Sequence, residues 1–155
     1  MALTTTNFRV RHAGLAIPLA ILGLMSPIAS AENGCSTLWS DYRGAALVEI
    51  ANDDPGNPFR YRPRCAMVVE GTVIRFRAIP EFGNHPLFAG SVEDGTPIVD
   101  PDSPIGSITS GTEADRLLPE AGEFTYFCDF HYAMGMQGSI LVLPQEVFAD
   151  GFEGG

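Results

Sequence analysis

The sequence predicts an all-β protein, organised as a sandwich or a barrel. Several short runs alternate between apolar and polar residues, which is the period-two pattern of half-buried strands. Turn-forming residues follow these runs at short intervals, as they do in sandwiches and barrels. After residue 31, no segment has helical spacing over a useful length. A helical class is therefore disfavoured.

The first 31 residues have the layout of a secretory signal peptide. Arg9 and Arg11 form a positively charged region, an apolar run follows from residue 13 to residue 25, and Ala29-Ser30-Ala31 matches a cleavage site. The apolar run is shorter than the roughly 20 residues that a membrane-spanning helix needs, so a retained anchor is disfavoured. We expect cleavage after Ala31 and a periplasmic or secreted location.

Charge and length narrow the class of partner. The 155-residue chain has a formal net charge of −10, and all nine of its basic residues are arginines. Such a charge disfavours nucleic acid and anionic membranes, and it would steer a basic protein partner toward the chain. Solubility after export explains the charge equally well. We expect one monomeric domain over residues 32–144, not inserted in a membrane once the signal is removed, and an acidic, glycine-rich tail over residues 145–155.

The first half of the domain is predicted to hold three strands. Residues 45–51 form an apolar run typical of an early strand, and residues 52–58 are dense in turn formers, which indicates a surface loop. Residues 59–69 and 72–79 each alternate, with arginines on the outward parity, and Glu70-Gly71 provides a turn between them. These two runs are therefore predicted to form a β-hairpin.

The second half is predicted to hold a long loop and three further strands. Residues 90–113 are rich in Gly, Pro, Ser, Thr and Asp and have no durable periodicity. They are predicted to form a long irregular loop with at most short strands. Aromatic, aliphatic and β-branched runs predict strands at residues 114–118, 123–128 and 139–143.

A cluster of metal-ligating residue types lies between the last two predicted strands. Cys128, His131 and Met136 bring a thiol, an imidazole and a thioether into one short segment. Two histidines and one cysteine in a trigonal array, with a long axial methionine, describe a blue-copper electron-transfer site. The second histidine must be His85, because the only other histidine lies in the predicted signal peptide. Met134 is a competing thioether, which we expect to pack or lie at the surface near the metal.

The cysteine count supports the same site. The chain has three cysteines, and exported proteins commonly pair their cysteines in disulfides. Cys128 belongs to the metal-ligating cluster, which leaves Cys35 and Cys65 as the natural disulfide pair. A free thiol in an oxidising compartment tends to be oxidised unless something holds it, and a metal would hold Cys128.

These motifs resemble those of the cupredoxins, the family of plastocyanins and pseudoazurins. The spacing Cys128-x-x-His131-x-x-x-x-Met136 is similar to the family's copper loop, and Asn84-His85-Pro86-Leu87 matches the place of its upstream histidine. Residues 63–76 and 121–128 are similar to two strand segments of the family, so the resemblance spans about residues 59–143. It implies a Greek-key β-sandwich of about seven to eight strands. It also implies one copper ion with four ligands, His85, Cys128, His131 and Met136.

Residues beside the ligands are expected to tune the copper site. Asn84 is expected to tie the His85 loop to the Cys128 turn. Family members commonly have proline before the second histidine, whereas this chain has Phe130, whose backbone N–H could reach the Cys128 sulfur and favour Cu(I). The carboxylate of Asp129 would instead favour Cu(II). The sequence leaves open which effect is larger.

The resemblance implies a mononuclear type 1 copper protein that carries single electrons between redox proteins and is not an enzyme. The electron is expected to leave through the edge of His131, inside an apolar docking patch suited to small and weak encounters. The patch is predicted to comprise Pro86, Leu87, Phe88, Tyr132, Ala133 and Met134.

Other classes of function use the same residue types. A copper chaperone or storage protein could use the same ligands. A structural zinc site would make Met136 an unusual fourth ligand. A Cys–His hydrolase is disfavoured, because Cys128 and His131 share one short turn and no orienting third group is evident. A multicopper oxidase would need further histidine-rich motifs, and no histidines are left to build them.

Overall fold

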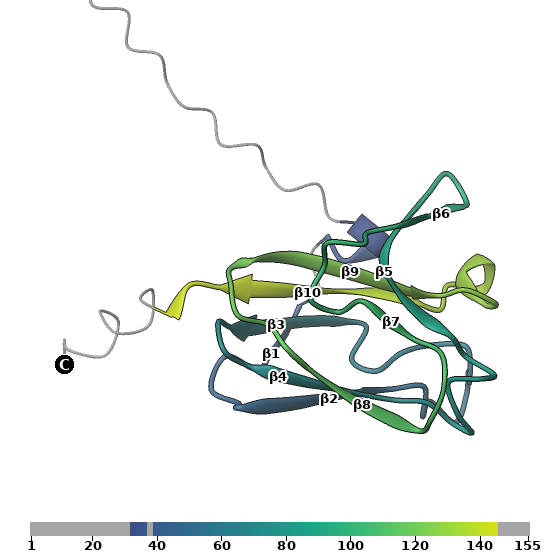
Figure 1. The fold of residues 1–155 in the computed structure, drawn as a ribbon, viewed down its shortest axis with the longest axis horizontal. Coiled ribbons are helices and arrows are strands. Elements are labelled where there is room, and N and C mark those ends of the chain that lie inside the picture. The colour runs from purple at the N-terminus through teal and green to yellow at the C-terminus, as the bar shows by residue number, and fades with distance from the viewer. Residues whose placement is uncertain (1–31, 37–38, 146–155) are drawn as a thin grey trace, which may run out of the picture.

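A computed structural model describes residues 32–36 and 39–145 of the chain (Figure 1). The predicted signal peptide and all but the first residue of the predicted tail lie outside the described residues. No helix of the described part is long and apolar enough to cross a membrane. The described elements are, in chain order, η1 (Glu32–Gly34), β1 (Ser40–Asp41), β2 (Leu47–Ala51), β3 (Cys65–Val69), β4 (Val73–Arg77), β5 (Leu87–Glu93), β6 (Thr96–Val99), β7 (Ser107–Ile108), β8 (Glu113–Leu117), β9 (Gly122–Cys128), η2 (Tyr132–Met134) and β10 (Gln137–Leu143).

The strands form two mixed sheets that pack as a sandwich (Figure 1). The large sheet has the order β1-β3-β10-β9-β5-β6, and β7 also pairs with β5. The small sheet has the order β2-β4-β8. In the large sheet, β10 runs parallel to β3 and antiparallel to β9. The predicted β-sandwich is confirmed. The described strands exceed the seven to eight expected because β1 and β7 are pairings of only two residues each.

Four of the predicted strands are present close to their predicted bounds. Residues 45–51, 114–118, 123–128 and 139–143 correspond to β2, β8, β9 and β10. In β2 the alternation has the expected cause, because Val48 and Ile50 are buried while Leu47 and Glu49 face solvent. Local periodicity therefore located these elements well.

The predicted hairpin between residues 59–69 and 72–79 is wrong. β3 pairs with β1 and β10 in the large sheet, whereas β4 pairs with β2 and β8 in the small sheet. The turn at Glu70-Gly71 therefore crosses from one sheet to the other. Alternation shows that a strand has an apolar face, but it does not identify the neighbouring strand. Here the two apolar faces meet in one core, where Val68, Ile74 and Phe76 are fully buried.

The stretch 90–113 contains more regular structure than a long irregular loop. β5 continues to Glu93, and β6 pairs with it across a tight turn at Asp94-Gly95. Both turn residues have positive φ, 48° and 77°, as a two-residue hairpin turn requires. Gly90 also has a reason to be glycine, because a Cβ there would overlap the backbone of Ile98. Irregular backbone is thus confined mainly to residues 100–106, before β7.

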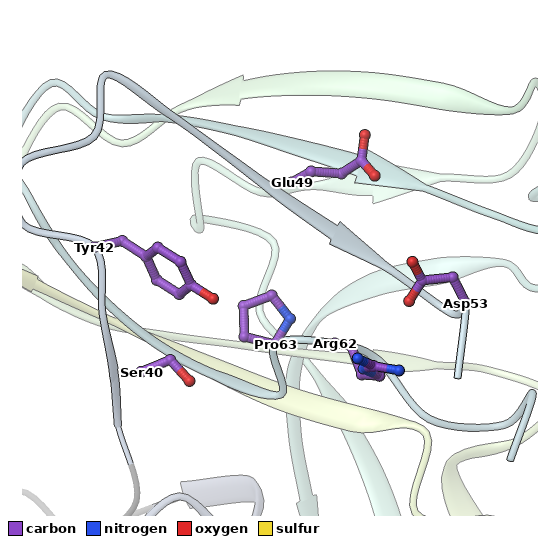
Figure 2. Close-up of a pocket in the computed structure, with 6 residues that line it drawn as sticks. All are labelled: Ser40, Tyr42, Glu49, Asp53, Arg62 and Pro63. Carbon is purple, nitrogen blue, oxygen red and sulfur yellow. The ribbon is translucent and has the colours of Figure 1, made fainter. Parts of the chain in front are cut away.

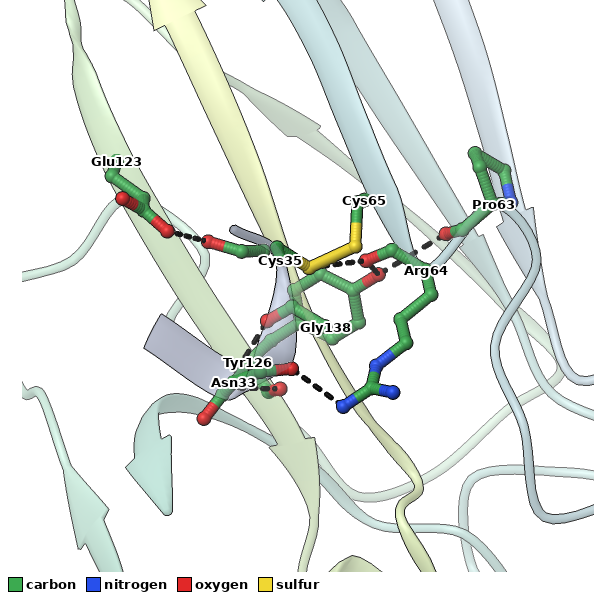
Figure 3. Close-up of a disulfide and its surroundings, with 9 residues drawn as sticks. Asn33, Cys35, Pro63, Arg64, Cys65, Glu123, Tyr126 and Gly138 are labelled. Carbon is green, nitrogen blue, oxygen red and sulfur yellow. Dashed lines mark hydrogen bonds between the residues drawn. A yellow bond between two sulfur atoms is a disulfide. The ribbon is translucent and has the colours of Figure 1, made fainter. Parts of the chain in front are cut away.

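The start of the described chain is fastened to the large sheet (Figure 3). The predicted disulfide between Cys35 and Cys65 is present, with the two Cα atoms 5.5 Å apart. Beside it, the side chain of Asn33 is buried, and its amide oxygen accepts a hydrogen bond from the Val92 N–H at 2.9 Å. The amide nitrogen of Asn33 donates toward three carbonyl oxygens, those of Gly90, Tyr126 and Gly138, at 3.1 to 3.3 Å. One side chain therefore ties η1 to β5, β9 and β10.

A single apolar core between the sheets extends to the ligand-bearing end of the fold. Cys128 and Met136 belong to this core cluster and are fully buried, as is Leu87 at the start of β5. Tyr126, two residues before Cys128, contacts the rings of Tyr61 and Phe76 edge to face at centroid distances of 5.3 and 5.2 Å. The end of β9 is consequently held by close packing, and with it the position of Cys128.

Candidate metal centre

Three of the predicted ligands converge at one end of the sandwich. The ligand atoms of His85, Cys128 and His131 all lie within 4.8 Å of one another. The Nδ1 atoms of the two histidines are 3.1 Å apart, and the Cys128 Sγ lies 3.4 Å from Nδ1 of His131. Among the described residues, this is the one group of three or more such side chains that could hold an ion.

Strand pairing brings His85 to the other two ligands. His85 ends the connection between β4 and β5, and Leu87, the first residue of β5, lies opposite Cys128 at the end of β9. A backbone hydrogen bond of 2.9 Å from the Asp129 N–H to the Pro86 carbonyl joins the two loops just beyond this pair. Residues that are 43 positions apart in the sequence therefore meet because their strands are neighbours in the large sheet.

The segment from Cys128 to Met136 forms a closed turn. The Cys128 N–H donates to the Met136 carbonyl at 2.8 Å, and the N–H groups of His131 and Met136 donate to the carbonyls of Cys128 and His131, each at 3.2 Å. The short helix η2 ends at Gly135, whose φ of 85° lies in the left-handed region that favours glycine. Backbone hydrogen bonds thus set the separation of Cys128 and His131 without any metal.

The thiol of Cys128 lies in an environment that opposes its ionisation. Burial raises the pKa of the Cys128 thiol, and the charge of Asp129 adds to this increase. The backbone N–H groups of Phe130 and His131 act in the opposite direction, since their hydrogen bonds to the sulfur stabilise the thiolate. A bound cation would reverse the balance, because a coordinating thiol loses its proton to the metal.

His85 is held in its neutral form. Burial lowers the pKa of His85, and the neighbouring His131 lowers it further. The backbone of Ile79 opposes this decrease in the pKa of His85. A neutral imidazole is the form that binds a metal, so the surroundings favour the ligating state.

The donor set fits copper. A thiolate is a soft ligand and imidazole suits copper, and the His85, Cys128 and His131 atoms that converge supply one sulfur and two nitrogens. The site is also placed within reach of the surface. The two histidines line a hollow together with Phe59, Pro80, Gly83, Asn84 and Phe130.

Comparison with known proteins gives the same result. The model of a family described as copper binding proteins, plastocyanin/azurin family, matches residues 49–143, which is more than half of the chain. The chain belongs to this family. In this cupredoxin, His85, Cys128 and His131 form the site of one copper ion. A blue copper protein is thus supported by both the family and the geometry.

Solved structures are similar to this cupredoxin in fold. Reduced rusticyanin is 20% identical over 73% of this chain and 89% of its own length, with a TM-score of 0.50. Rusticyanin from Thiobacillus ferrooxidans is 19% identical over 73% of this chain and 88% of its own length, with a TM-score of 0.50. Auracyanin from Roseiflexus castenholzii is 17% identical over 64% of this chain and 98% of its own length, with a TM-score of 0.45. A search of curated protein sequences found no match.

The two methionines of the copper loop occupy different environments. Met136 is fully buried in the core cluster that also contains Cys128, whereas Met134 is 56% exposed. Met134 lies in η2, on the outside of the turn. The expectation that Met134 would pack or lie at the surface agrees with this position.

The predicted tuning residues lie beside the ligands in different ways. Asn84 is exposed, and its backbone N–H donates to the Glu81 carbonyl at 3.1 Å, within its own turn. The backbone contact between the two ligand loops is instead made by Asp129 and Pro86. Phe130 is 60% exposed, and its backbone N–H lowers the pKa of the Cys128 thiol.

Part of the predicted docking patch is inaccessible. Pro86 and Leu87 are buried, because β5 begins at Leu87 and this residue pairs into the large sheet. Phe88 and Tyr132 are half-buried, while Ala133 and Met134 are exposed. The accessible part of the predicted patch therefore comes from the copper loop and only marginally from the His85 loop.

The sequence did not indicate that Asn52 and Phe59 lie beside the site. Residues 52–58 read as a surface loop and Phe59 as the start of a strand, yet Asn52 is 97% buried and Phe59 stacks on the His131 ring. The segment 59–64 forms no named strand and is joined to β2 only by an isolated bridge between Arg62 and Ala51. One available signal was the asparagine placed directly after an apolar strand, where a side-chain amide commonly caps the backbone.

A second hollow lies between β1, β2 and the segment before β3 (Figure 2). It is lined by Ser40, Tyr42, Glu49, Asp53, Arg62 and Pro63. Both of its carboxylates lie near Arg77, at 2.9 Å for Glu49 and 3.5 Å for Asp53. These charges are mutually compensated and partly exposed, so the hollow is a solvated ion-pair surface.

Proposed function

We propose that this protein is an exported type 1 blue copper protein that carries single electrons between redox proteins. The observation that carries the proposal is the convergence of His85 Nδ1, His131 Nδ1 and Cys128 Sγ at one end of the sandwich. Strand pairing brings His85 there, and backbone hydrogen bonds fix the spacing of Cys128 and His131. Met136 is proposed as the weak axial ligand, because its side chain is buried in the same core cluster as Cys128. The predicted signal peptide over residues 1–31 supports export.

The chain's own residues favour fast electron transfer by holding one arrangement. Copper, when bound, supplies the Cu(II)/Cu(I) couple. His85 is held by neighbouring strands, and Cys128 and His131 are held by one closed turn, so little rearrangement accompanies a change of charge. The N–H groups of Phe130 and His131 at the Cys128 sulfur withdraw charge from it and stabilise the reduced state.

We propose that redox partners dock on the exposed residues around His131. Phe130, Ala133 and Met134 are exposed there, and Tyr132 is half-buried. A surface of this kind suits the small and short-lived encounters of electron-transfer proteins. The net charge of −10 supports a partner with a basic docking surface, since opposite charges accelerate encounter.

Reversible redox cycling of the purified protein tests the proposed function. One equivalent of Cu(II) is added, and the visible absorption is followed through repeated cycles of reduction by ascorbate and oxidation by ferricyanide. An electron carrier is expected to recover its full absorption in each cycle and to keep its copper. Loss of copper to a chelator after each reduction would instead favour the chaperone or storage function.

Substitution of the two methionines separates their roles. Met136→Leu is expected to keep the blue colour and to raise the reduction potential, because Cu(II) loses a donor while Cu(I) is satisfied by three ligands. Met134→Leu is the matched control and should leave the potential unchanged, since Met134 is exposed on η2. The potential is measured by equilibrium redox titration. Equal effects of the two substitutions would exclude Met136 as the axial ligand.

A further inference from the structure

We propose that Phe59 and Asn52 are positioning residues for the two copper-ligating histidines. Phe59 covers one face of the His131 ring, and Asn52 fastens the loop of Phe59 to the loop that carries His85. Neither residue is proposed to bind copper. The proposal depends on the copper site and does not depend on the electron-carrying function.

Phe59 makes a ring contact with each histidine of the site. Its ring stacks on His131 with a centroid distance of 4.5 Å and an interplanar angle of 28°. It also lies 6.2 Å from the His85 ring at an angle of 53°. Phe130 contacts His131 edge to face at 6.4 Å, so His131 has aromatic neighbours from two separate segments. Such ring pairs have preferred geometries and therefore restrict the orientation of the imidazole.

Asn52 links the segment before Phe59 to the segment before His85. Its amide nitrogen donates to the Pro58 carbonyl at 3.2 Å and to the Ile79 carbonyl at 2.9 Å. Its amide oxygen accepts from the Ile79 N–H at 2.7 Å. Asn52 is only 3% exposed, so water cannot readily replace these partners.

The Ile79 backbone, which Asn52 holds through two hydrogen bonds, belongs to the β4–β5 connection that carries His85. A displacement of Asn52 would therefore shift this connection, as well as the backbone that presents Phe59. Outer residues that hold a ligating histidine in this way tune metal affinity.

The loop that carries Phe59 is closed by backbone contacts at its base. Ala51 and Arg62 exchange two backbone hydrogen bonds, of 3.0 and 2.8 Å. Within the loop, the Phe59 N–H donates to Oδ1 of Asn57 at 3.0 Å. The side chain of Asn52 bonds to Pro58 within the loop, so hydrogen bonds hold both the base of the loop and its middle. Phe59 is therefore presented to His131 by a defined backbone, and its ring is half-buried in place.

Phe59 and Asn52 preorganise the site on the side of His131, the ligand that is least buried. Cys128 is fully buried in the core, whereas His131 is only half-buried and lies at the surface hollow. The Phe59 ring excludes water from one imidazole face and limits rotation of His131 away from the metal. A ligand that is already oriented loses less freedom when it binds.

Copper affinity distinguishes positioning from simple packing. Phe59→Leu keeps an apolar side chain but removes the ring stack, and it is expected to weaken Cu(I) binding about 2- to 10-fold. Phe59→Tyr restores the ring and should bind within about 2-fold of the unchanged protein. Phe124→Leu is the matched control, since Phe124 is also half-buried against the core but lies on β9, and no ring contact joins it to either histidine. Affinity is measured by competition for Cu(I) with the chelator bicinchoninate.

A second readout does not depend on copper loading. In the copper-free protein, the ring protons of His131 lie over the Phe59 face, so NMR should show a ring-current shift that Phe59→Leu abolishes and Phe59→Tyr retains. Thermal unfolding of each variant reports any loss of packing. Unchanged Cu(I) affinity and unchanged His131 resonances in a folded Phe59→Leu variant would overturn the proposal. Equal losses in Phe124→Leu would also overturn it, because they would indicate general destabilisation.

Asn52 is tested by the substitution Asn52→Asp. The new carboxylate retains an acceptor for the Ile79 N–H but loses both donated hydrogen bonds. If Phe59 and Asn52 act as one unit, the double variant of Phe59→Leu and Asn52→Asp will lose less Cu(I) affinity than the product of the two single fold-losses. A fold-loss in the double variant equal to that product would show that Asn52 does not act through Phe59.

Failure of redox cycling in the unchanged protein would contradict the electron-carrying function and leave these affinity results intact.

Discussion

Cys128→Ser is expected to abolish the blue absorption of the copper-loaded protein and to weaken copper binding by more than about 100-fold. Removing a residue that hydrogen-bonds to a ligand typically costs about 10- to 100-fold in metal affinity, and Cys128 supplies the thiolate itself. The intense visible band of such a site arises from charge transfer between thiolate and Cu(II), and a serine hydroxyl is neither soft nor ionised at neutral pH. The measurement is the visible spectrum after addition of one equivalent of Cu(II).

The serine variant is a conservative test of the ligand. The substituted oxygen is smaller than sulfur, and the N–H groups of Phe130 and His131 keep an acceptor in the position of the sulfur. Cys128 is fully buried, so thermal unfolding of the metal-free variant must confirm that it folds. A folded Cys128→Ser protein that remains blue would exclude Cys128 as a ligand and with it the proposed site.

Removal of the disulfide is expected to lower the free energy of unfolding by about 3–4 kcal/mol while the copper site survives. The bond closes a loop with a sequence separation of 30, and a loop of this size gives that value in the chain-entropy model. The double variant Cys35→Ser with Cys65→Ser leaves Cys128 as the only cysteine of the chain. Its stability is measured by denaturant unfolding, and its copper site by the visible spectrum.

The disulfide variant also serves as a control for the thiol assignment. It removes two sulfurs at a distance from the metal centre, so its absorption after addition of Cu(II) should equal that of the unchanged protein. The hydrogen bonds of Asn33 to β5, β9 and β10 remain available to hold the N-terminal segment. A loss below about 1 kcal/mol would show that these polar contacts, and not the covalent link, fasten the segment.

The three converging ligands could be predicted because the chain offers so few alternatives. With two histidines after the predicted signal peptide and one cysteine inside a metal-ligating motif, counting alone selected His85, Cys128 and His131. The structure brings these three together. The disulfide was predictable for the same reason, since removing Cys128 left one possible pair.

Pairing between distant segments could not be predicted in the same way. The alternation of residues 65–69 and 73–77 correctly indicated two strands, but their neighbours are β10 and β2, which lie far away in the sequence. Periodicity reports the environment of a side chain and carries no information about which strand lies next to it. The assumption that adjacent strands form a hairpin was the source of that error.

The sequence also could not predict which residues beside the ligands are buried. Pro86 and Leu87 follow a ligand directly and are apolar, which suggested a docking patch, yet the pairing of Leu87 with Cys128 places them inside. Conversely, Asn52 and Phe59 flank a segment rich in turn formers, and only the folded chain shows that Phe59 contacts both histidines and that Asn52 binds the backbone of Ile79. Their contacts with His85, Ile79 and His131 span 26 to 72 positions in the chain.

The position of β10 determines when the copper site can form. β10 is the last strand of the described residues, yet it lies inside the large sheet, between β3 and β9, and its parallel partner β3 begins at residue 65. Without β10, β3 and β9 each lack one neighbouring strand. The turn from Cys128 to Met136 also cannot close, because the Cys128 N–H donates to the carbonyl of Met136, the residue before β10. Contacts of such long range form slowly, so we expect the site to be completed late in folding. Burial of the Cys128 thiol therefore depends on a strand that follows it in the sequence.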